Sequence, residues 1–74
     1  MNEVSDDVLL EYIKNTRKEA KAYRDLWMAN QALSELPEND PNKFYLEINK
    51  YQELEKLCLE FLKKLESIRD DRGL

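Results

Sequence analysis

A single break interrupts an otherwise helical pattern in this chain. Residues 34–41 hold both prolines, Pro37 and Pro41, and the only glycine, Gly73, lies near the C-terminal end. Proline and glycine are the strongest local breakers of regular structure, so their placement leaves two long uninterrupted stretches joined by one turn. The sequence therefore predicts an all-α, rod-like antiparallel hairpin of two helices, completed by self-association or by a partner.

The first helix is predicted over residues 6–35. The Ser5 hydroxyl can cap its first turn, and the carboxylates of Asp6 and Asp7 suit the positive end of the helix dipole. Apolar and small side chains then recur at alternating spacings of four and three residues, the pattern of a helix that packs along a neighbour. The seam consists of Leu9, Ile13, Thr16, Ala20, Tyr23, Trp27 and Asn30, and is widened by Val8, Tyr12, Leu26 and Leu33.

The turn between the helices is predicted over residues 36–40. The residue before Pro37 is pushed out of the α region, so the first helix should end near Ser34 or Glu35. Asp40 is expected to act as the N-cap of the second helix, with Pro41 at the first helical position. The second helix is then predicted to continue to about residue 70 (residues 41–70).

The second helix carries a wide apolar arc. Its seam consists of Phe44, Ile48, Tyr51, Cys58, Leu62 and Leu65, one flank of Leu54, Leu57, Phe61 and Ile68, and the other of Tyr45 and Leu59. This arc covers roughly half of the circumference, whereas an amphipathic surface helix needs only about 100°. One antiparallel neighbour cannot cover it, so the second helix is expected to pack against two things. A helix of about 30 residues is roughly 45 Å long, which makes the hairpin a rod.

The chain forms one domain at most, over residues 1–74. A core this small usually needs disulfides, a metal or a partner for stability. Cys58 is the only cysteine, which excludes an internal disulfide, and without histidine there is no usual ligand set for zinc. Self-association or a protein partner therefore remains, and neither a metal nor another cofactor is expected.

Charge and hydropathy argue against membranes and nucleic acids as partners. No apolar run approaches the roughly 18–20 residues that span a bilayer. The acidic residues 1–7 lack the basic start and apolar centre of a signal peptide, and a lone cysteine fits a reducing compartment. The net charge of −4 disfavours binding to a phosphate backbone or to anionic lipid. We therefore expect a cytoplasmic protein.

No pattern in the sequence indicates catalysis. The chain has no histidine for acid–base chemistry near neutral pH and no glycine-rich loop for phosphate. Glu53, Glu55 and Glu60 are interpreted as a solvated helix face. Cys58 lies among apolar seam residues, where a free cysteine usually acts as a small hydrophobic side chain. The sequence therefore predicts a protein without enzymatic activity.

A basic cluster on the first helix admits three interpretations. The cluster consists of Lys14, Arg17, Lys18, Lys21 and Arg24. Nucleic-acid binding is disfavoured because acidic residues flank the cluster. The two preferred hypotheses are ion pairs with glutamates of the second helix, and a protein-binding face on which Leu10 and Met28 are anchors.

Other residues within the seams also remain open to two interpretations. Trp27 can be hairpin core or an interface anchor, because tryptophan is enriched at binding hot spots. Polar seam residues either set the helix register or lie at its rim. These are Thr16, Asn30, Glu47 and Glu55. Residues 70–74 are expected to fray.

Several short features occur together in a particular order. They are Arg17, Glu19, Ala20 and Lys21 on the first helix, Gln31 and Leu33 near its end, Asp40 and Pro41 followed by Phe44 and Tyr45, and Leu54 with Glu55. In length, layout and these features the chain resembles the small YscE/SsaE-type co-chaperones of bacterial type III secretion. The resemblance implies a cytoplasmic, non-enzymatic hairpin that binds a larger tetratricopeptide-like chaperone. That pair keeps the secretion needle subunit soluble and monomeric before export.

The partner-binding surface is expected on the side of the second helix that hairpin closure leaves open. Closure should use Leu9, Ile13, Tyr23 and Trp27 against Phe44, Ile48, Tyr51, Leu62 and Leu65. The predicted partner-binding residues are then Leu54, Leu57, Phe61 and Ile68, with Leu10 and Met28 as a lesser site across the rod. The alternatives are a homodimeric four-helix regulator or inhibitor and, as the weakest, a nucleic-acid-binding hairpin. A homodimer is also an option for the isolated protein.

Overall fold

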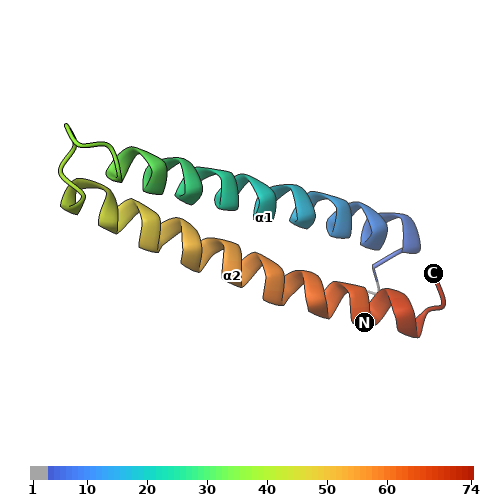
Figure 1. Cartoon of the computed structure of the whole chain (residues 1–74). Coiled ribbons are helices and arrows are strands. Elements are labelled where there is room, and N and C mark those ends of the chain that lie inside the picture. Colours follow the sequence, from blue (N-terminus) through green and yellow to red (C-terminus); the bar gives the residue numbers. More distant parts are fainter. Residues whose placement is uncertain (1–3) are drawn as a thin grey trace.

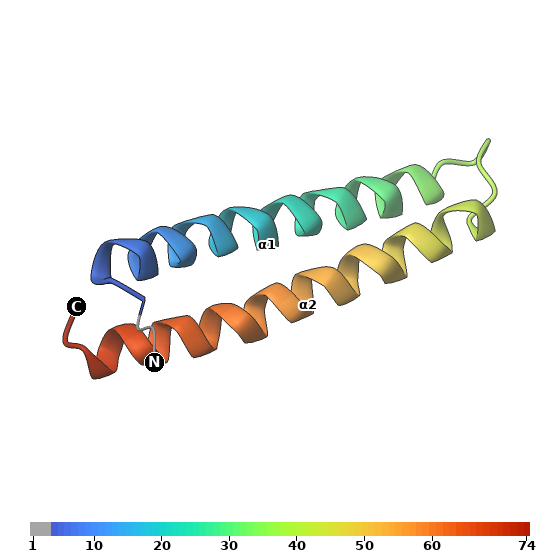
Figure 2. The same ribbon diagram turned by 180° about the vertical axis from the view of Figure 1, so that it is seen from behind.

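The structure, a computed structural model, describes residues 4–74; residues 1–3, part of the acidic N-terminal segment considered above, lie outside it. The described chain consists of two helices, α1 (Asp6–Ser34) and α2 (Asn42–Asp71), which run antiparallel along the rod (Figure 1). Its principal extents are 54 × 17 × 16 Å. Seen from behind, the helices again lie side by side, with the connecting loop at one end (Figure 2). The predicted all-α, rod-like hairpin is confirmed.

α1 begins with a side-chain cap and ends at a loop that is tied back to it. The Val8 backbone N–H donates to the Ser5 hydroxyl oxygen at 3.3 Å, which satisfies one of the free N–H groups of the first turn. At the other end, the side-chain amide of Asn39 donates to the Leu33 carbonyl at 2.8 Å. The helix ends at Ser34, as the sequence predicted from the following proline.

α2 begins one residue later than predicted, at Asn42. Pro41 has helical backbone angles, φ −54° and ψ −32°, and stands just before the helix. The Asp40 carboxylate nevertheless accepts a hydrogen bond from the Asn42 N–H at 3.0 Å, and its carbonyl accepts one from Lys43 at 3.1 Å. The N-cap position is therefore Pro41 and not Asp40 as predicted, and Asp40, one residue earlier, satisfies N–H groups at the start of α2.

The expected fraying of residues 70–74 is wrong. The backbone N–H groups of Gly73 and Leu74 donate to carbonyls three and five residues earlier, at 3.0 and 3.1 Å, and Gly73 has φ +74°. This is a Schellman motif, which favours glycine because the backbone is left-handed. The Arg72 guanidinium also lies 2.9 Å from the Asp6 carboxylate, joining the end of α2 to the start of α1.

The best-buried part of the core lies near the end of the rod opposite the loop. It consists of Leu9, Ile13, Leu62 and Leu65, whose exposed fractions are between 2% and 9%. Toward the loop the seam is only half-buried, and there the rings of Tyr23 and Tyr51 stack with centroids 6.2 Å apart. The residues expected to widen the α1 seam lie instead at the surface: Val8, Tyr12, Leu26 and Leu33. One neighbouring helix is too narrow to cover them.

Candidate functional site

The two long sides of the rod, where α1 meets α2, differ in character. On one side, which we call the charged side, Arg17 pairs with Glu66 at 2.7 Å and Arg24 pairs with Glu55 at 3.0 Å. A shallow hollow on this side is lined by Arg17, Ala20, Lys21, Arg24, Asp25, Glu55, Leu59 and Leu62. Charged side chains from both helices therefore bridge this side.

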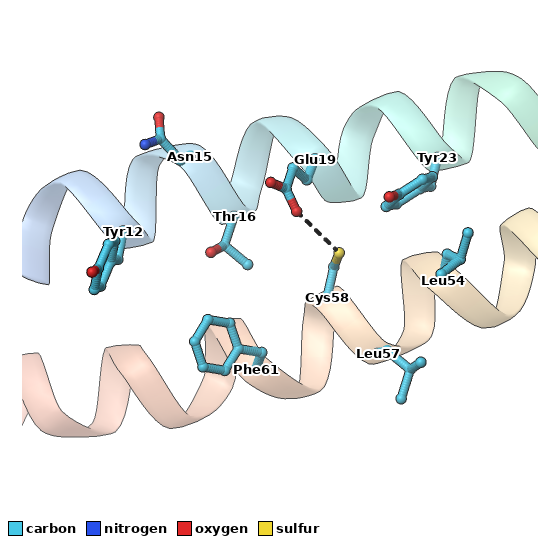
Figure 3. A pocket seen from close by; sticks show the side chains of 9 residues that line it. All are labelled: Tyr12, Asn15, Thr16, Glu19, Tyr23, Leu54, Leu57, Cys58 and Phe61. Carbon is cyan, nitrogen blue, oxygen red and sulfur yellow. Dashed lines mark hydrogen bonds between the residues drawn. The ribbon is translucent and has the colours of Figure 1, made fainter.

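The opposite side holds an open apolar groove of about 470 Å³. Its lining residues, which define what we call the apolar groove, are Tyr12, Asn15, Thr16, Glu19, Tyr23, Leu54, Leu57, Cys58 and Phe61 (Figure 3). Tyr12 and Tyr23 come from α1 and the three large aliphatic and aromatic residues from α2. In the close-up, Leu57 points away from α1, which leaves it on the outer edge of the groove (Figure 3).

The large side chains of the groove are only partly covered by the hairpin. Leu57 is 53% exposed and Phe61 is 52% exposed, while Leu54 is half-buried. Ile68, also exposed, lies seven residues beyond Phe61, so it continues the same side of α2. The structure therefore brings the main predicted partner-binding residues of α2 onto one side of the rod.

Leu10 and Met28, the lesser predicted site, lie elsewhere. Both are exposed, and helical spacing places them on the stripe of α1 that carries Arg17 and Arg24. Met28 lines a separate hollow with Trp27, Gln31, Ala32 and Glu35. These two residues therefore belong to the charged side and do not extend the apolar groove.

All five groove residues that come from α1 were absent from the predicted partner-binding set, Tyr12 and Glu19 among them. Tyr12 was expected to widen the hairpin seam, and Glu19 was named only among the features of the family resemblance. Tyr12, Thr16, Glu19 and Tyr23 follow one another along α1 at intervals of four, three and four residues. This helical stripe shares Thr16 and Tyr23 with the α1 seam, and its regular spacing was the sequence signal that could have identified the α1 side of the groove.

Glu19 and Cys58 meet inside the groove. The Cys58 thiol lies 3.9 Å from the Glu19 Oε2 atom, within the range of a weak S–H···O hydrogen bond (Figure 3). Burial raises the pKa of the Cys58 thiol, and the charge of Glu19 and this hydrogen bond raise it further. A higher thiol pKa lowers the thiolate fraction at neutral pH, which argues against a reactive nucleophile.

The basic cluster of α1 is largely engaged within the hairpin. Arg17 and Arg24 pair with glutamates of α2, and Lys21 lies 3.5 Å from Asp25 one turn later. These contacts agree with the ion-pair interpretation of the cluster. The more exposed pairs, Arg17 with Glu66 and Lys21 with Asp25, contribute about 0–1 kcal/mol each, so they arrange the surface more than they stabilise the fold.

The expectation that Glu55 belongs to a solvated helix face is wrong, and Glu55 is instead one of the polar residues of the seam. One carboxylate oxygen accepts a hydrogen bond from the Trp27 indole N–H at 2.8 Å, and the other pairs with Arg24. The Glu55 side chain is only 13% exposed, so this polar group sits inside the helix–helix seam. Helical periodicity placed Glu55 and Trp27 on the sides of the two helices that face each other, but it gave no indication of the hydrogen bond between them.

Among the described residues, neither a metal-ligand cluster nor a membrane-spanning helix is found. Between residues 4 and 74 there is no cluster of three histidine, cysteine, aspartate or glutamate side chains that could hold a metal ion. Neither α1 nor α2 has the length and apolar character that a membrane-spanning helix requires.

Comparison with known proteins adds no relative. No protein-family model, curated protein or solved structure matches this chain.

Proposed function

We propose that this chain is a non-enzymatic protein-binding module that docks its partner on the apolar groove. The observation that carries the proposal is the difference between the two sides of the rod. One side is bridged by ion pairs between the helices, whereas the other leaves Leu57 and Phe61 half-exposed beside a hollow. Exposed apolar surface that is contiguous usually marks a site of interaction.

The specific form of this proposal is a co-chaperone of type III secretion, acting in the cytoplasm. It rests on the resemblance to the YscE/SsaE-type proteins, which are small helical hairpins. In that role the chain would bind a larger tetratricopeptide-like chaperone, and the two together would keep the needle subunit soluble before export. The hairpin shape and the groove are compatible with this role and support it as a working hypothesis.

A pair of leucines on α2 provides a matched test. Leu57 lines the apolar groove and is 53% exposed, whereas Leu59 lines the hollow on the charged side and is 47% exposed. Tagged full-length protein, Leu57→Asp and Leu59→Asp would each be purified from the native cell, and co-eluting proteins identified by mass spectrometry. Wild type and Leu59→Asp should retain a larger helical-repeat chaperone and a small export substrate, and Leu57→Asp should lose both.

The outcome separates the general from the specific proposal. A different partner that depends on Leu57 and not on Leu59 would support the binding module but contradict the secretion role. Equal recovery of every partner by both variants, with unchanged far-UV helicity, would contradict docking on the apolar groove.

A further inference from the structure

We infer that the apolar groove binds one amphipathic helix of a partner protein, and that this helix places a lysine or arginine opposite Glu19. The inference rests on the proposed docking function and adds the chemistry of the partner. Three observations carry it: the area that the hairpin leaves exposed, the spacing of the groove residues, and the charge within the groove.

The exposed area of the hairpin is large enough to leave room for one interface. The chain exposes 5836 Å² of surface at a mass of 8.9 kDa. A compact monomer of that mass is expected to expose about 4,800 Å². The difference, roughly 1,000 Å², is close to the roughly 800 Å² that each partner contributes to a standard protein–protein interface. The elongated rod therefore exposes more surface than a compact monomer, and the excess is on the scale of one protein–protein interface.

The spacing of the groove residues fits a helix. On α1 the lining residues Tyr12, Thr16, Glu19 and Tyr23 follow one another at intervals of four, three and four. On α2, Leu54, Cys58 and Phe61 follow at intervals of four and three. Two such rows, side by side and antiparallel, form a groove into which the ridge of a third helix packs, with anchors at i, i+3 or i+4, and i+7.

The charge in the groove selects the kind of helix. Among the described lining residues, Glu19 is the only one with a charged side chain. The positions three and four residues from Glu19 hold Asn15, Thr16, Ala22 and Tyr23, so no cation of α1 neighbours it on the helix surface. A helix that covers the groove removes water from this carboxylate. Unless that helix supplies a cation, the carboxylate is left desolvated without a counter-charge and with only the weak hydrogen bond from Cys58, which opposes binding.

A second copy of the chain does not meet this requirement through the same groove. A two-fold interface brings a surface patch against itself. Such a contact would gather two Glu19 carboxylates and the lining residues of two grooves, which in residues 4–74 include no lysine or arginine. A different protein that carries a basic residue in the apolar stripe of a helix can supply the counter-charge for Glu19, which a second copy cannot supply through the same groove.

The first test is a selection on the full-length protein. A displayed library of 18-residue helices, with leucine and alanine along one stripe and the central stripe position fully randomised, would be panned against wild type and Glu19→Lys. Wild type should enrich lysine or arginine at the central position, and Glu19→Lys should enrich aspartate or glutamate. Glu60→Lys is the control, because it changes an exposed acidic residue of α2 outside the groove lining. It should enrich lysine or arginine at the central position, as wild type does.

The second test locates the bound helix. The highest-affinity selected peptide should slow the reaction of Ellman's reagent with Cys58, the only cysteine, because that thiol lies in the groove. Its affinity should fall at least tenfold in Leu57→Asp and stay within twofold in Leu59→Asp. Far-UV helicity of both variants should match wild type.

The inference would be overturned by the absence of an enriched helix, by enrichment without a basic preference, or by a peptide that leaves the Cys58 reaction unchanged. A wild-type dimer in sedimentation that Leu57→Asp dissociates would also overturn it, because the groove would then hold a second copy. If native partners still depend on Leu57 while the selection shows no basic preference, only the inference fails and the docking function stands.

Discussion

The Trp27 indole N–H donates a hydrogen bond to Glu55 Oε1 at 2.8 Å across the helix–helix seam. The second oxygen of the same carboxylate lies 3.0 Å from the Arg24 Nε atom. One acidic side chain of α2 therefore holds two side chains of α1 that are nearly one turn apart. A contact of this kind is satisfied at only one relative position of the helices, so it specifies the register of the hairpin.

Glu55→Ala should lower the free energy of unfolding by about 1–3 kcal/mol. The substitution removes the carboxylate that accepts the hydrogen bond of Trp27, which leaves the indole N–H unpaired in the seam. Urea unfolding followed by the fluorescence of Trp27, the only tryptophan, measures this directly. Glu53→Ala, at an exposed neighbouring position, should stay within about 0.5 kcal/mol of wild type. Equal effects of the two substitutions would show that the seam does not depend on Glu55.

Leu9→Ala should cost about 2–5 kcal/mol, because Leu9 is 2% exposed and its truncation leaves a cavity in the best-buried cluster. For a hairpin this small, that loss should abolish cooperative unfolding. Leu46→Ala is the control, since Leu46 is 80% exposed and should change stability by less than about 0.5 kcal/mol. Thermal melts by circular dichroism distinguish the two. A cooperative wild-type-like melt for Leu9→Ala would place the core elsewhere.

Replacing Asp40 and Pro41 together by alanine should lower stability by about 1–2 kcal/mol. The carboxylate that accepts from the Asn42 N–H would be lost, and the unfolded chain would gain freedom at the former proline. Chemical denaturation midpoints at constant slope measure the effect. An unchanged midpoint would mean that the start of α2 does not depend on this cap.

Glu19→Gln should lower the pKa of the Cys58 thiol, because the negative charge and the anionic acceptor that help to raise it would be gone. The thiolate is the reacting form, so the rate of alkylation by iodoacetamide near pH 8 should increase and its pH profile should move toward lower pH. Burial still raises the pKa in this variant, so the thiol should remain less reactive than in the unfolded chain. Glu60→Gln should leave the profile unchanged, and a shift of equal size there would contradict a local effect.

Wild-type protein should not bind duplex or single-stranded nucleic acid below about 1 μM at physiological salt, because Arg17 and Arg24 already pair with glutamates of α2. Fluorescence anisotropy with labelled DNA and RNA measures this. Tighter binding with a steep salt dependence, lost when Arg17, Lys21 and Arg24 are changed to alanine, would restore the nucleic-acid hypothesis.

The fold could be predicted from the sequence because its determinants are local. Pro37 and Pro41 confine the turn, and the spacing of four and three residues identifies the seam on each helix. Periodicity also indicated that α2 has more apolar arc than α1 covers. It overestimated the α1 seam, because the width that one neighbour covers depends on the helix–helix distance. Tyr12 and Leu26 accordingly lie at the surface.

The parts that escaped prediction depend on pairing between the helices. A helical wheel gives the direction of a side chain but not its height against the neighbouring helix, so the contact of Glu55 with Trp27 could not be derived from it. The same holds for Glu19 and Cys58, which lie far apart in sequence. The ordered C-terminal turn is different: Gly73 was a local signal for a helix cap, and the fraying interpretation overlooked it.

The position of the best-buried cluster has a consequence for how the hairpin forms. Leu9 and Leu65 lie close to opposite ends of the sequence, yet they belong to the same buried cluster of the described residues. The loop brings together only half-buried residues, so helix–helix contacts that form outward from the turn bury little apolar surface at first. Closing a long chain segment is slow compared with forming a local turn. The rate-limiting step of folding is thus expected to be the contact between the distant helix ends. Helix–helix contacts should then form from that end toward the turn as well as from the turn outward.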